Sequence, residues 1–66
     1  MTTFVKEHTK NMRCVRKGKY HMVFFNPANN LYEIWDAIEQ CEWFDDRTEA
    51  IEAMKYLDKH YMEEYI

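Results

Sequence analysis

Cysteines and histidines are the side chains of this 66-residue chain that could bind a metal or serve as nucleophile and base. The plausible donors are Cys14, His21, Cys41 and His60, and none of the paired spacings typical of zinc sites occurs among them. A catalytic cysteine would need a histidine and an orienting carboxylate in a concave pocket. The chain holds no serine and no phosphate-cradling glycine loop. The sequence therefore predicts no catalytic residue, no metal site, no cofactor and no enzyme activity.

Charged side chains are the second group that could act on a partner, and they divide unevenly along the chain. Residues 1–21 hold six Lys and Arg against Glu7, whereas residues 22–66 hold eleven carboxylates against three Lys and Arg. The local charges are thus +5 and −8 within a formal net charge of −3. Because summed potentials steer association even at modest net charge, this division predicts a small binding protein that recognises a charged partner.

Acidic residues recur at every third position through the middle of the chain, a period that fits neither strand nor helix and spreads carboxylates over a whole lobe. Such a lobe is either a solubilising surface or a contact for a partner protein with a basic surface. We expect the contact, anchored by exposed aromatic rings. The predicted partner-binding residues are Glu33, Asp36, Glu39, Glu42, Trp43, Asp45, Asp46, Glu49, Glu52 and Tyr56.

The basic segment supports an alternative function, which is binding of RNA or single-stranded DNA. Cations would contact phosphates while an aromatic ring stacks on bases, and the residues for this alternative are Arg13, Arg16, Lys17, Lys19 and Tyr20. An isoelectric point near 5.5 counts against it, because the acidic lobe would repel the same backbone. The same segment could instead complement the acidic helix within the fold or across a homodimer.

The elements that must position these side chains include a C-terminal helix over residues 46–64. Asp46 with Glu49 three residues later is a capping signature. Ala50, Met54, Leu57 and further apolar residues recur at helical spacing. Asp58 falls inside this apolar arc, so it must reach water at the edge of the stripe or pair with Lys55 or with a basic residue of the other half. Tyr56 is expected on the polar side.

A strand is predicted over residues 20–25, which are rich in β-branched and aromatic types and stop at the turn formers of residues 26–30. Residues 11–16 would pair with it as a basic hairpin, and Gly18 would supply a positive φ in the loop. Residues 31–44 fit either a helix capped by Asn30 or two strands, over 31–36 and 40–44. The short loop before Leu31 favours the strands, whereas the missing glycine near Ala37 counts against them.

Length allows a single core, because a domain of this size buries only about 60% of its unfolded surface. We expect a flexible polar leader over residues 1–10 and one domain over 11–66. Two unpatterned cysteines predict reduced thiols and a cytoplasmic location. No apolar run approaches the roughly 18 residues of a membrane helix, so no membrane contact is expected.

Residues 20–62 resemble short accessory proteins of bacteriophages: a β-hairpin opens on an Asn-Pro turn, and Trp43-Phe44-Asp45-Asp46-Arg47-Thr48-Glu49-Ala50 leads into a helix. The resemblance implies a protein that binds and inhibits or redirects a host enzyme. The expected fold is α+β, a small antiparallel sheet of three to four strands packed against one C-terminal amphipathic helix.

Overall fold

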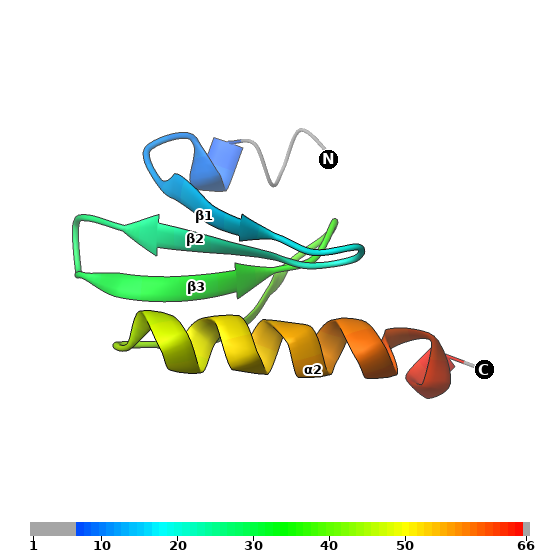
Figure 1. The fold of residues 1–66 in the computed structure, drawn as a ribbon. Helices are drawn as coiled ribbons and strands as arrows, with labels where there is room; N and C mark the ends of the chain where they lie inside the picture. The colour runs from blue at the N-terminus through cyan, green and yellow to red at the C-terminus, as the bar shows by residue number, and fades with distance from the viewer. Residues whose placement is uncertain (1–6, 66) are drawn as a thin grey trace.

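The main elements of the protein are a four-stranded antiparallel sheet and one long helix that packs on it. The computed structural model describes residues 7–65, and the side chains of residues 7–61. The sheet order is β1 (Arg13–Lys17), β2 (Met22–Asn26), β3 (Leu31–Trp35) and β4 (Gln40–Phe44). Helix α2 (Arg47–Tyr65) follows and packs on β2, β3 and β4 (Figure 1). The predicted α+β fold is confirmed, and residues 31–44 form strands rather than a helix.

Side-chain to backbone hydrogen bonds shape the turns, which explains how the hairpins form with a single glycine in the chain. Between β2 and β3, Asn26 accepts the N–H of Ala28 and Asn29 accepts the N–H of Leu31, while Asn30 adopts a φ of 58°. Between β3 and β4, Asp36 Oδ1 accepts the N–H groups of Ile38 at 2.7 Å and Glu39 at 2.8 Å. An aspartate therefore stabilises the turn where the sequence offers no glycine.

The main core lies between the sheet and α2. Val23, Ile34, Ala50 and Met54 are almost fully buried there, and partly buried side chains such as Val15 surround them. The helix begins as predicted, because Asp46 Oδ2 accepts the N–H of Glu49 at 2.9 Å. These contacts fix α2 on the sheet and determine which of its side chains face β1.

A second, smaller core covers the opposite face of the sheet. Phe24 and Trp35 are buried there with Met12 and Met22 beside them. Residues 1–10 were predicted to form a flexible leader. Residues 7–9 instead form a helical turn in which Thr9 is buried. The rest of that leader, residues 1–6, lies outside the described residues.

Gly18 does not adopt the positive φ that was predicted for it, so that prediction is wrong. The structure gives another reason for a glycine at this position. A Cβ atom at this position would overlap Asp58 Oδ2 and Met54 Sδ, so the absence of a side chain lets α2 approach the turn between β1 and β2. Gly18 is therefore required for close packing of the helix against this turn.

Replacing Gly18 by alanine should lower the free energy of unfolding by about 1–3 kcal/mol, because the added methyl group forces Asp58 or Met54 to shift. Urea unfolding followed by circular dichroism measures this. The exposed neighbour Lys17 provides the control, since Lys17→Ala should stay within about 0.5 kcal/mol of the parent. A Gly18→Ala variant as stable as the parent would show that the close contact is dispensable.

Candidate functional site

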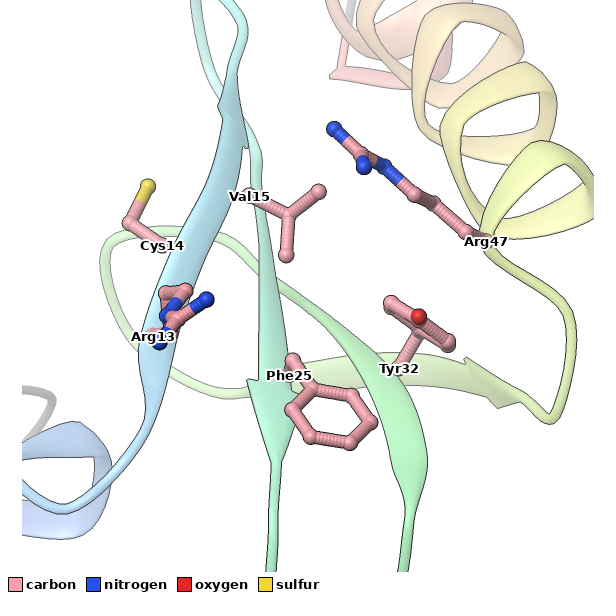
Figure 2. A pocket seen from close by; sticks show the side chains of 6 residues that line it. All are labelled: Arg13, Cys14, Val15, Phe25, Tyr32 and Arg47. Atoms are coloured by element: carbon pink, nitrogen blue, oxygen red, sulfur yellow. The ribbon is translucent and has the colours of Figure 1, made fainter.

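Two open hollows between β1 and α2 bring together cations from both halves of the chain. The first, of about 340 Å³, is lined by Arg13, Val15, Phe25, Tyr32 and Arg47, with Cys14 at its rim (Figure 2). Figure 2 shows the two arginines coming from different elements, Arg13 from β1 and Arg47 from the start of α2. The rings of Phe25 and Tyr32 form a tilted pair with centroids 5.0 Å apart. The hollow thus combines two guanidinium groups with half-buried aromatic surface.

The second hollow, of about 400 Å³, surrounds Gly18 at the other end of β1. Its cations are Arg16, Lys17, Lys19, Lys55 and Lys59. Lys55 and Lys59 are four residues apart and therefore project from the same side of α2. We call the cations of the two hollows the basic surface; its members are Arg13, Arg16, Lys17, Lys19, Arg47, Lys55 and Lys59.

Positive charge on this side of the molecule is almost unopposed. Lys10 lines a third hollow, which shares Arg13 and Phe25 with the first, so every Lys and Arg among residues 7–61 lines one of the three hollows. Asp58 is the sole carboxylate lining any of them. Within residues 7–61 the ion pairs are Lys10 with Glu7 at 3.9 Å and His21 with Asp58 at 2.6 Å. Among residues 7–61, the basic surface therefore has Asp58 as its one counter-charge, and none of its Lys and Arg side chains forms an ion pair.

Asp58 is occupied by hydrogen bonds that hold the basic hairpin on α2. Its carboxylate accepts the backbone N–H groups of Lys19 and Tyr20 and lies 2.6 Å from His21 Nδ1. Burial acts to raise the pKa of Asp58, but the bond to His21 and the two N–H groups outweigh it, so the pKa is lowered. The sequence left open whether Asp58 reaches water, pairs with Lys55 or pairs with the other half of the chain. The structure shows that Asp58 bonds with residues 19–21 of the other half.

Tyr20, predicted to stack on bases, is already stacked within the fold. Its ring lies 4.6 Å from that of Tyr61 at an interplanar angle of 21°, and Lys19 Nζ lies 5.4 Å from its centroid. One face of the ring is thus covered by the helix. Phe25 and Tyr32, which are not among the residues predicted for nucleic-acid binding, are the rings that line the first hollow.

The predicted acidic contact set is only partly on the surface. Glu33 is 7% exposed and its carboxylate accepts hydrogen bonds from Trp35 Nε1 and Asn26 Nδ2, both at 3.0 Å. Asp36 is 8% exposed and holds the turn between β3 and β4. These two carboxylates are therefore structural and do not belong to an exposed acidic surface.

The remaining members of that set are exposed, as expected. Trp43 is 57% and Tyr56 64% exposed, whereas Trp35 is core. The exposed acids are Glu39, Glu42, Asp45, Asp46, Glu49 and Glu52. They form no ion pair within residues 7–61, so the positive hairpin does not neutralise them.

Part of the negative charge lies at the edge of the sheet opposite β1. The basic surface borders β1, whereas Glu42 and Trp43 belong to β4, three strand spacings away. At about 4.8 Å per spacing the two edges are about 14 Å apart, well beyond the Debye length of about 8 Å at physiological salt. Glu42, the acid of β4, is therefore largely screened from an anion bound beside β1. Asp45 and Asp46 directly precede Arg47 of the first hollow, so the objection raised by the acidic isoelectric point is weakened for Glu42 alone.

Cys41 is the thiol with an unusual environment. The residue is exposed, but partial desolvation of its thiol and the neighbouring Asp36 carboxylate raise the pKa of Cys41 to about 11, so it is a protonated thiol at neutral pH and a poor nucleophile. The described side chains close enough to share a metal ion are His21, Asp36 and Cys41, whose ligand atoms lie within 4.8 Å of one another. Cys14 and His60, considered from the sequence, are not part of this group.

Comparisons with family models, curated proteins and solved structures give no match to this chain. Among the described residues, no helix is both long enough and apolar enough to cross a membrane. The functional assignment therefore depends on the chemistry of the surfaces described above.

Proposed function

We propose that the protein binds single-stranded nucleic acid along the basic surface between β1 and α2. The supporting observation is that Lys55, Lys59 and Arg47, which belong to the acidic half of the sequence, join the hairpin cations around two shared hollows. Grouping these cations, with Asp58 as the one carboxylate that lines the hollows, costs electrostatic energy unless further anions bind there. A phosphate backbone supplies anions at regular spacing, and Phe25 with Tyr32 offers apolar surface for a base.

The dimensions suit a short stretch of single strand. Residues 47 and 59 of α2 are twelve positions apart, so at about 1.5 Å per residue their cations are distributed over about 18 Å of helix. The hollows are open rather than enclosed clefts, which suits a flexible chain that is gripped through its backbone. We expect little sequence preference, because phosphate contacts carry no base information.

Fluorescence anisotropy of labelled single-stranded DNA and RNA, measured over a salt series, tests this proposal. If four to seven cations reach phosphates, the logarithm of the association constant should fall linearly with the logarithm of salt concentration, with a slope of about −3 to −5. Absence of binding at low salt, or binding that salt does not weaken, would reject the proposal.

The exposed Trp43 on edge strand β4 favours a second candidate function, in which the protein binds a partner protein with a basic surface. Glu42 and Asp45 flank this ring in the chain and are exposed with it. A large exposed ring among unpaired carboxylates is a suitable anchor for an interface. This is the inhibitor-like role that the resemblance to bacteriophage accessory proteins implies. We also propose a cytoplasmic location, because the thiols of Cys14 and Cys41 are free.

Trp43→Ala should weaken capture of such a partner by about 2 kcal/mol while leaving the fold stable, because the ring is exposed. Affinity purification from the native host supplies the partner, and titration of the purified partner compares the parent with the variant. Val23→Ala, which damages the core instead, distinguishes loss of an anchor from loss of folding. Equal affinity of the parent and Trp43→Ala would exclude Trp43 as the anchor.

A further inference from the structure

Three side chains of different ligand chemistry meet at one end of the sheet, and none of the three lines a hollow of the basic surface. His21 directly precedes β2, Asp36 directly follows β3, and Cys41 belongs to β4. Because Met22 pairs with Trp35, the antiparallel register brings His21 and Asp36 next to each other across β2 and β3. One nitrogen, one oxygen and one sulfur atom of the three side chains lie within 4.8 Å of one another.

Two of these side chains are already oriented by hydrogen bonds. Asp58 Oδ1 lies 2.6 Å from His21 Nδ1, so when Nδ1–H of the neutral imidazole donates to this carboxylate, Nε2 carries the lone pair for a ligand. Asp36 uses Oδ1 for both of its backbone bonds, to Ile38 and Glu39, so its Oδ2 could take a ligand without breaking the turn. A histidine held by a carboxylate is the usual outer arrangement of a metal-binding imidazole.

We propose that His21, Asp36 and Cys41 bind one zinc ion, with Asp58 as the outer carboxylate that orients His21. Imidazole, carboxylate and thiolate are the three ligand types of zinc, and three protein ligands leave a fourth position for water. The thiolate and the imidazole favour zinc over magnesium or calcium, which prefer oxygen ligands. Both His21 and Asp36 are buried, while Cys41 is exposed and provides a route of entry.

The geometry requires a small contraction. With zinc bonds of about 2.0–2.3 Å, neighbouring ligand atoms of a tetrahedral site are about 3.5 Å apart. The atoms of this group, within 4.8 Å, must therefore approach by at most about 1.3 Å. Rotation of the exposed Cys41 side chain can supply this for the sulfur. Binding converts the Cys41 thiol to a thiolate, and its proton is released to water as the zinc–sulfur bond forms. The three ligands lie outside the proposed nucleic-acid surface, and Asp58, which orients His21, lines the second hollow; the proposal does not depend on nucleic-acid binding.

Titration of the full chain with Zn²⁺ and with Co²⁺ tests the proposal. We expect one ion per chain, a rise in Tm with Zn²⁺ that a chelator reverses, and with Co²⁺ a thiolate charge-transfer band in the near ultraviolet. Cys41→Ser should abolish that band and weaken binding by at least about tenfold. Cys14→Ser, which changes the cysteine outside the group, should leave both unchanged.

Asp36→Asn is the second ligand variant, because its amide oxygen still accepts the N–H groups of the turn while its metal affinity falls. Thermal unfolding without metal shows whether each variant is folded, so one folded ligand variant suffices for the comparison. The proposal is overturned if the parent binds neither ion, if the folded Cys41→Ser or Asp36→Asn variant binds as tightly as the parent, or if Cys14→Ser loses the cobalt band.

Discussion

Replacement of Asp58 by alanine should lower the free energy of unfolding by about 2–4 kcal/mol, the largest effect on stability that we expect from any single change outside the core. The variant leaves the N–H groups of Lys19 and Tyr20 and the ring of His21 without their acceptor. A domain of this size rarely has more than about 3–5 kcal/mol in total. Most Asp58→Ala molecules should therefore be close to unfolding at room temperature, as urea denaturation would show.

Two further variants make this result specific. Asp58→Asn keeps one acceptor oxygen and should be less destabilising than Asp58→Ala, whereas Glu52→Ala on the exposed side of the same helix should change stability by no more than about 0.5 kcal/mol. If Asp58→Ala unfolds at the same urea concentration as the parent, the carboxylate does not hold the hairpin on the helix.

The stability carried by Asp58 should also depend on pH. Because the pKa of the folded state is lowered, the contribution is fully present above the unfolded value of about 3.9 and is lost as the pH falls from there through the folded pKa. The parent should therefore lose stability below about pH 4, and Asp58→Asn should lose less over the same interval. Asp36, whose pKa is lowered by the N–H groups of Glu39 and Ile38 against the opposing effect of burial, accounts for part of the remaining slope.

Neutralising Lys55 and Lys59 together should produce the largest effect on nucleic-acid binding. Lys55→Gln/Lys59→Gln removes two cations of the second hollow and keeps good helix formers at both positions. We expect affinity at low salt to fall by about tenfold or more and the salt slope to become shallower by about 1.4, since each phosphate contact on a single strand contributes about 0.7. Fluorescence anisotropy over a salt series measures both quantities.

Glu49→Gln/Glu52→Gln is the matched control, because it changes two exposed charges of the opposite sign on the same helix. It should leave the slope unchanged. An unaltered slope in the lysine variant, with its fold intact, would mean that the helix cations do not contact phosphates. The nucleic acid would then have to lie elsewhere, and the surface shared by β1 and α2 would lose its proposed role.

Much of the fold follows from local sequence signals. The capping pair of Asp46 and Glu49 locates the start of the helix, and the asparagines of residues 26–30 locate the turn between β2 and β3. These signals act within a few residues, so they can be read without knowledge of the tertiary structure. The strands of residues 31–44 were harder to predict, since Asp36 replaces the expected glycine by accepting two N–H groups.

The candidate sites required the tertiary structure. Lys55 and Lys59 share a helix side by their spacing alone, but only the packing of α2 against the first hairpin places them beside Lys17 and Lys19. Burial of Glu33 and Asp36 could not be predicted from the sequence either. A carboxylate is buried only where hydrogen-bond donors surround it, and these donors come from strand residues or from turn residues. Their regular spacing in the sequence did not distinguish them from exposed acids.

Backbone amide NMR of the full chain during titration with a short single-stranded oligonucleotide tests the proposed function most directly. The predicted result is a set of salt-sensitive shift changes confined to β1, the Gly18 turn and residues 47–59, with Phe25 and Tyr32 included. The contradicting result is a spectrum that does not change at low salt, or one that changes mainly around Trp43 on β4.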